Sequence, residues 1–148
     1  MPQLSSFPTN GSRESVRASW GNPSQIKKLG AGERWIYSTA MEGRETWFVE
    51  FDATGRAGLP LQVLTNERVQ MLKPSMSVDE VENLIGPKYY ELRYPFKKDE
   101  PVHIYRFLRS EHEAVCLYLH FSPTGSLTEI GYAPDALRVI TLKRACQT

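Results

Sequence analysis

Apolar positions at helical spacing predict a short helix between Ser77 and Ile85. The apolar side chains of this stretch recur every three or four residues, so they form one stripe along a helix. Ser77 has Glu80 three residues later, the spacing of a capping box, in which the hydroxyl and the carboxylate each accept a bond from a free backbone amide. Gly86 and Pro87 follow at once, and this pair ends helices.

A weaker copy of the pattern lies 65 positions upstream. Ser12, Val16, Trp20 and Gly21 align with Ser77, Val81, Ile85 and Gly86. The copy predicts a second short helix, from Ser12 to Trp20.

Each predicted helix is followed by segments that alternate between apolar and polar residues, as half-buried strands do. The expected strands are 35–37, 46–51 and 57–63 after the first helix, and 103–108, 114–121 and 127–132 after the second, with 137–142 as a further candidate. Residues 22–33 and 86–101 are expected to be loops, and Thr65 is expected to cap a short helical turn.

The two alternating strands 46–51 and 114–121 have one purely apolar side each. That side carries Trp47, Val49, Phe51, Leu117, Leu119 and Phe121, and we expect the helices to cover it. The short aromatic strands are also assigned to the core, through Trp35, Tyr37, Tyr105 and Phe107, although aromatics on strands can also line a binding face.

The repeated order of elements predicts a duplicated α+β fold of two tandem modules, each with short helices on one face of an antiparallel sheet. The expected division is a flexible leader at 1–11, a first module at 12–64, a second module at 65–136, and a C-terminal strand or tail at 137–148.

Three short motifs occur in both modules: a Ser-x-x-x-Val helix ending in Gly and Pro, a Trp/His-x-Tyr strand, and a Phe-x-x-x-Gly hairpin. Together they resemble the SmpA/OmlA family, whose best-known members are outer-membrane lipoproteins associated with β-barrel assembly. The tandem arrangement also resembles the β-lactamase inhibitor protein fold. The resemblance covers Ser12 to Tyr132, with two small departures: Ser75 stands where the family often has glycine, and Trp20 replaces a smaller aliphatic residue.

This resemblance implies a bacterial periplasmic protein, anchored to the outer membrane if its precursor carries a lipobox. The leader would then be a tether from the lipid. No lipobox cysteine precedes the leader in this sequence. Membrane contact is therefore expected only through a lipid anchor absent from this chain.

Composition removes several partner classes. The chain has 148 residues, with 18 basic and 17 acidic residues and a formal charge of +1, so it lacks the basic surplus of a nucleic-acid binder. It contains no apolar run of the roughly 20 residues that span a bilayer. Cys116 and Cys146 are the only cysteines, too few for a metal knuckle, and the sequence leaves open whether they pair.

No catalytic pattern emerges from the titratable residues. His112 lies between Glu111 and Glu113 in a hairpin loop, which is more simply a solvated polar turn. His103 and His120 have no Asp, Glu or Cys at metal-ligand spacing, and no phosphate-binding loop or nucleophile motif is present. We therefore expect no enzymatic activity, no metal and no cofactor.

The opposite, mixed face of the sheets is the candidate partner-binding surface, because aromatic and charged side chains together are typical of recognition surfaces. It comprises Phe48, Glu50, Arg106, Tyr118 and His120. An ordinary solvated sheet face is the alternative. The charged loop from Tyr94 to Glu100 is assigned as a mobile surface loop, with partner contact as its alternative.

The leading functional hypothesis is a non-catalytic interaction or scaffold module of the cell envelope, linked to outer-membrane assembly or integrity. Its rival is a proteinaceous hydrolase inhibitor of the β-lactamase-inhibitor type. A third possibility is a small-ligand binder with a cleft lined by Tyr89, Tyr90 and Trp35.

Overall fold

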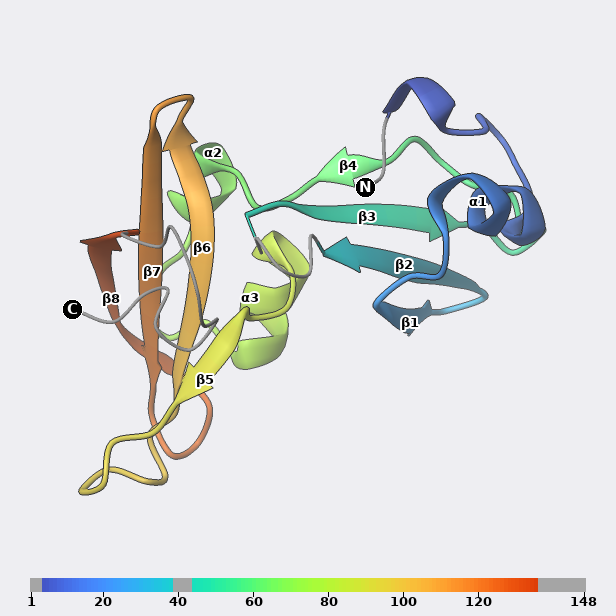
Figure 1. Ribbon diagram of the computed structural model, residues 1–148. Helices are drawn as coiled ribbons and strands as arrows, with labels where there is room; N and C mark the ends of the chain where they lie inside the picture. The colour runs from blue at the N-terminus through green and yellow to red at the C-terminus, as the bar shows by residue number, and fades with distance from the viewer. Residues whose placement is uncertain (1–3, 39–43, 136–148) are drawn as a thin grey trace. The chain divides into compact units, whose positions relative to one another are not determined.

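The chain forms two compact units (Figure 1). The structure is a computed structural model, and it describes residues 4–38 and 44–135. The first unit comprises Met1–Ala40 and Glu45–Val63, and the second comprises Met41–Arg44 and Leu64–Thr148. Each contains a four-stranded antiparallel sheet and short helices. The predicted α+β class with antiparallel sheets is therefore confirmed.

The first unit has the strand order β1-β2-β3-β4. Its elements are η1 (Leu4–Ser6), α1 (Arg13–Trp20), β1 (Gln25–Leu29), β2 (Gly32–Ser38), β3 (Thr46–Phe51) and β4 (Leu61–Gln62). Val16 and Trp20 of α1 pack against the predicted apolar side of the sheet. The core formed there consists of Val16, Trp20, Trp35, Tyr37, Val49, Phe51 and Ala57.

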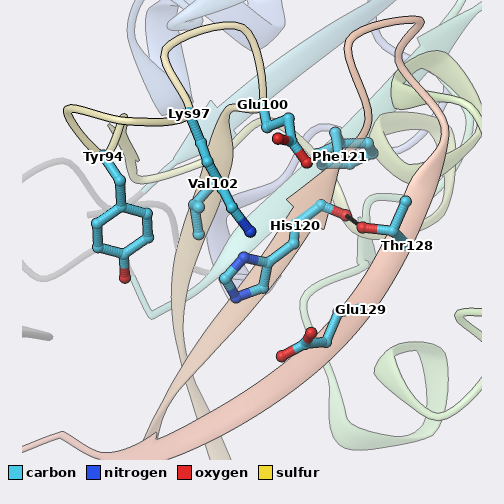
Figure 2. A pocket seen from close by; sticks show the side chains of 8 residues that line it. All are labelled: Tyr94, Lys97, Glu100, Val102, His120, Phe121, Thr128 and Glu129. Carbon is cyan, nitrogen blue, oxygen red and sulfur yellow. Dashed lines mark hydrogen bonds between the residues drawn. The ribbon is translucent and has the colours of Figure 1, made fainter.

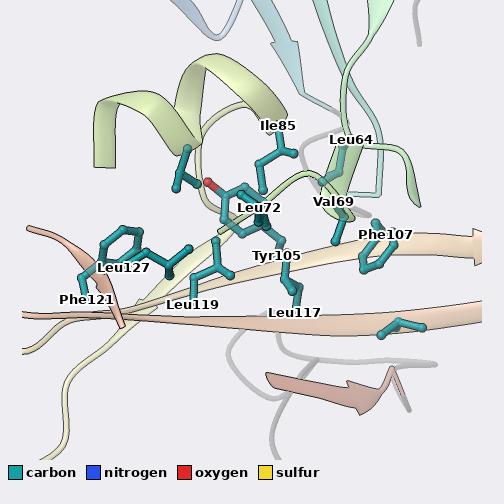
Figure 3. Close-up of a cluster of buried hydrophobic side chains, with 12 residues drawn as sticks. Leu64, Val69, Leu72, Ile85, Tyr105, Phe107, Leu117, Leu119, Phe121 and Leu127 are labelled. Atoms are coloured by element: carbon teal, nitrogen blue, oxygen red, sulfur yellow. The ribbon is translucent and has the colours of Figure 1, made fainter. Parts of the chain in front are cut away.

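The second unit has the strand order β5-β6-β7-β8. Its elements are α2 (Asn66–Val69), α3 (Val78–Ile85), β5 (Tyr90–Leu92), β6 (Val102–Ser110), β7 (Glu113–Phe121) and β8 (Leu127–Pro134). Figure 3 shows the side chains of the two helices meeting one face of β6 and β7. Tyr105, Phe107, Leu117, Leu119 and Phe121 line that face, all at most 1% exposed.

The ends of α3 are built as the sequence predicts. The Ser77 side chain accepts from the backbone N–H of Glu80, and the Glu80 carboxylate accepts from the backbone N–H of Ser77. Gly86 ends the helix with φ 89°, a left-handed conformation that other residues rarely adopt. The hydroxyl of Tyr105 then donates to the Gly86 carbonyl at 2.7 Å.

The same arrangement occurs at α1. Ser12 caps its start by accepting from the backbone N–H of Ser15, and Gly21 ends it with φ 80°. The Tyr37 hydroxyl donates to the Gly21 carbonyl at 2.8 Å. In both units, therefore, a core tyrosine from the second strand satisfies a carbonyl that the helix end leaves free.

Two of the predicted loops contain strands. The first, β1, pairs along its whole length with β2, and the second, β5, pairs with β6. The predicted strand 57–63 is longer than the observed one. Only Leu61–Gln62 forms a strand, and Ala57 makes an isolated bridge to Phe51. Pro60, which cannot donate to a ladder, lies between these two pieces.

Residues 4–11 of the predicted flexible leader are packed in the structure. Leu4–Ser6 form a turn of 3₁₀ helix, and the ring of Phe7 packs edge-on against Trp20 with centroids 5.1 Å apart. The Gly11 carbonyl accepts from the N–H of Ala57 at 2.9 Å. Residues 4–11 thus belong to the packed first unit. The predicted strand at 137–142 and the tail to 148 lie outside the described residues.

Candidate functional site

The predicted binding face of the first sheet is largely closed. Phe48 is only 4% exposed and packs with Ile36 and Val63. The Arg34 guanidinium lies 4.3 Å from the centroid of the Phe48 ring and forms an ion pair with Glu50 at 2.8 Å. The assignment of Phe48 as an exposed contact is therefore wrong, whereas Glu50 does lie at the surface.

Arg106 is likewise not a surface contact, because it is 1% exposed. Its Nε donates to Asp135 Oδ2 at 2.8 Å, and Arg44 Nη2 bonds the same oxygen at 3.0 Å. The guanidinium also lies 5.2 Å from the centroid of the Tyr89 ring. The strand register places Arg106 on the predicted side of the sheet, where a charge is buried because it is paired.

Tyr118 and His120 are the predicted contacts of the second sheet that stay partly exposed. They lie on β7 opposite Ile104 and Val102 of β6. Partial burial raises the pKa of the Tyr118 hydroxyl, and the neighbouring Tyr94 adds to this rise. The 93–100 loop therefore lies beside Tyr118 on this face of the second sheet.

The 93–100 loop is held by internal bonds. Two consecutive turns close when the N–H of Lys97 donates to the Tyr94 carbonyl and the N–H of Glu100 donates to the Lys97 carbonyl, both at 3.0 Å. Arg93 binds the Glu91 carboxylate at 2.7 Å and also donates to the Lys98 carbonyl. On this braced loop the Phe96 side chain is 99% exposed.

We call the surface made by these two segments the loop face. It consists of Tyr94, Phe96, Lys97, Tyr118 and His120. Sequence reasoning found the two strand residues through alternation. The loop was expected to be a mobile surface loop, with partner contact as the alternative, and its two aromatic residues beside Pro95 in a charged segment favour that alternative.

A cleft of about 290 Å³ opens at the loop face (Figure 2). It is lined by Tyr94, Lys97, Glu100, Val102, His120, Phe121, Thr128 and Glu129. Figure 2 shows the Lys97 side chain reaching from the loop toward the His120 imidazole, with Glu129 on the neighbouring strand β8. The Thr128 hydroxyl donates to the backbone carbonyl of His120 at 3.0 Å and ties β8 to β7 beside the cleft.

His103 points to the other, covered side of the sheet and is 4% exposed. Its ring packs against Phe121 with centroids 4.7 Å apart, and its Nε2 lies 3.5 Å from Glu91. Burial lowers the pKa of His103 to about 4, against a weaker opposing effect of Glu91. Within 4–38 and 44–135, no group of three or more His, Cys, Asp or Glu side chains is arranged to hold a metal ion.

The aromatic side chains assigned to the core are confirmed there. Trp35, Tyr37, Tyr105 and Phe107 are all at most 5% exposed. Trp35 is completely buried in the core of the first unit, whereas the third hypothesis placed its side chain at the wall of a ligand cleft.

Cys116 is disulfide-bonded and completely buried on β7, where it pairs in register with Arg106. Cys146, the only other cysteine in the sequence, lies outside the described residues. In the described part of the chain, no helix has both the length and the apolar character needed to cross a membrane.

Comparisons with known proteins give little to place beside this geometry. No protein-family model matches the chain, and no curated protein matches its sequence. Among solved structures, the chain is similar to a DUF4309 family protein, YjgB, from Bacillus subtilis, with 14% identity and a TM-score of 0.33. That similarity covers 90% of this chain and 86% of the other.

Proposed function

We propose that the chain is a non-catalytic protein-interaction module of the cell envelope, and that its second unit binds a protein partner through the loop face. The observation that carries the proposal is Phe96, fully exposed on a loop held by two turns and by Arg93. An apolar side chain that stays in water gains no burial energy within the chain, and its burial by a partner stabilises a complex.

The chemistry around Phe96 favours a protein as the partner. Tyr94 is 45% exposed, and Tyr118 and His120 are partly exposed on the adjoining strand. Aromatic side chains dominate the binding energy of protein interfaces, and a braced loop loses little conformational freedom on binding.

The disulfide at Cys116 supports a location outside the cytoplasm, because such bonds persist in oxidising compartments. We therefore keep the periplasm as the proposed location, with outer-membrane anchoring through a lipid if the precursor carries a lipobox. A role in outer-membrane assembly or integrity is part of the same proposal and depends on the SmpA/OmlA resemblance.

The proposal includes the tandem, β-lactamase-inhibitor-like architecture of two duplicated modules. Its support is the repeated cap design, in which Gly21 and Gly86 end the helices and each accepts a bond from a strand tyrosine. The hairpin glycines Gly55 and Gly125 also share a left-handed conformation, with φ 80° and 84°.

Site-specific crosslinking tests the loop face directly. A photoreactive amino acid at position 96 is expected to give one dominant covalent adduct in intact cells, which mass spectrometry identifies. The same amino acid at position 59 is the control, since Leu59 is 75% exposed but lies on the first unit.

Binding of the identified partner should then fall at least tenfold for Phe96→Ala and Tyr118→Ala, with circular dichroism unchanged. Equal adducts from positions 96 and 59, or undiminished binding by both variants, would contradict the proposal.

A hydrolase inhibitor is the second candidate, and the braced loop is the observation that favours it. A loop held by its own hydrogen bonds, with an exposed aromatic side chain, can enter an active-site cleft. Nanomolar inhibition of an envelope or secreted hydrolase, lost in Phe96→Ala, would select this function over a scaffold role.

A further inference from the structure

The cleft at the loop face holds charged side chains of both signs that have no partner among residues 4–38 and 44–135. Lys97, Glu100, His120 and Glu129 all line it. Within 4–38 and 44–135, no side chain of these four makes a hydrogen bond or an ion pair, although each lies within a few residues of others that do. Charged groups that converge on a cleft without pairing are available to a ligand.

We propose that this cleft binds a small zwitterion, namely a free α-amino acid or a dipeptide with an apolar side chain. The ammonium of Lys97 would take the ligand carboxylate, and the carboxylates of Glu100 and Glu129 would take the ligand ammonium. A ligand of only one charge would meet a like charge on one wall, which is unfavourable.

The size and the apolar part of the cleft narrow the ligand further. A volume of about 290 Å³ is at the small end for ligand sites, so it suits a ligand of a few to about fifteen heavy atoms. Val102, which pairs with His120 across the two strands, lines the cleft as its apolar wall, and the ring of Tyr94 lies at the rim, whereas the Phe121 ring packs on the covered face. This wall provides a place for an aliphatic side chain.

The inference goes beyond the proposed protein partner, because it concerns a ligand taken by the purified chain alone. The two can fail separately. Crosslinking at position 96 reads out the partner, whereas titration of the purified protein reads out the cleft.

The test is titration with three leucine derivatives, followed by amide ¹H–¹⁵N spectra. L-leucine carries both charges, N-acetyl-L-leucine carries only the carboxylate, and L-leucinamide carries only the ammonium. We expect L-leucine to bind with a Kd of about 1 mM or tighter and to shift the amides of 97–102, 120–121 and 128–129. The two blocked derivatives should bind at least tenfold more weakly.

Matched variants locate the charges. Lys97→Met and Glu129→Gln are expected to weaken L-leucine binding at least tenfold. Lys98→Met and Glu111→Gln remove the same charges from exposed positions outside the cleft and should leave it unchanged. Equal binding of a blocked derivative, equal losses in the control variants, or no saturable shifts with L-leucine and with Leu-Leu would each overturn the inference.

Discussion

Arg106 shows at the scale of one residue how a charge on the predicted open face becomes a structural group. Its guanidinium and the Asp135 carboxylate are 1% and 0% exposed, so neither is solvated by bulk water. A buried ion of this kind is stable only while its partner remains, and the strand alternation alone cannot show that partner.

Replacing Arg106 with Met should therefore destabilise the second unit. The change removes the more deeply buried of the two guanidinium groups that bond the Asp135 carboxylate and leaves only Arg44, and we expect the free energy of unfolding to fall by about 3 kcal/mol in chemical denaturation. Arg109→Met is the matched control: its ion pair with Glu113 is exposed, so the loss should stay below about 1 kcal/mol. Equal effects of the two variants would mean that Arg106 is not buried as described.

His103 gives a residue-scale prediction about pH. Its pKa is lowered to about 4 mainly by burial, with Lys88 and Arg93 adding to the effect and Glu91 opposing it. The unfolded chain, with an ordinary histidine pKa near 6.5, binds the proton first as pH falls. Stability conferred by neutral His103 is therefore complete above about pH 6.5 and is lost between there and pH 4.

We expect the free energy of unfolding to decrease from pH 7 to pH 5, and to decrease less in His103→Leu. Carboxylates do not cause this decrease. The pKa values of Glu33, Asp52 and Glu91 are lowered in the folded chain, so their contribution to stability is lost only below this pH window. His112→Leu is the control, since that side chain is 94% exposed. An unchanged pH dependence in His103→Leu would show that the buried imidazole does not cause it.

At the scale of elements, the helices α1 and α3 end with the same bond, which a strand tyrosine donates to the carbonyl of the capping glycine. Tyr37→Phe and Tyr105→Phe each delete only the hydroxyl and leave a carbonyl without this donor. We expect each variant to lose about 1–2 kcal/mol of unfolding free energy in its own unit, measured by denaturation. Tyr132→Phe, with a side chain 43% exposed, is the control and should be neutral. A loss in one unit alone would argue against a duplicated cap design.

The same elements show how far sequence patterns reach. The caps of α1 and α3 were predictable because Ser, Glu and Gly act through local backbone bonds. The strands β1 and β5 were missed because each is an edge strand. In β1, Lys27 and Lys28 interrupt the apolar alternation, and the strand forms because its backbone pairs with β2.

The candidate site divides in the same way. Tyr118 and His120 follow from strand alternation, which depends only on local geometry. The burial of Phe48 depends on Ile36 and Val63, and that of Arg106 on Asp135. These partners are distant in sequence or lie on other elements, so no pattern along the chain specifies them.

At the scale of the whole molecule, the two units can be followed separately in solution. The three tryptophans, Trp20, Trp35 and Trp47, all lie in the first unit, and the second unit contains none. Tryptophan fluorescence therefore reports the first unit, whereas far-ultraviolet circular dichroism reports the sheets of both.

Reduction of the Cys116 disulfide should affect the two spectroscopic signals differently. A disulfide stabilises a fold chiefly by constraining the unfolded chain, and loss of the bond at Cys116 is expected to lower the second unit's free energy of unfolding by about 2–4 kcal/mol. Because each unit has its own core, the circular dichroism midpoint should fall while the tryptophan midpoint stays in place. Cys116→Ser is the control, since reductant should not change its midpoints. A tryptophan midpoint that falls together with the circular dichroism signal would mean that the two units unfold as one cooperative structure.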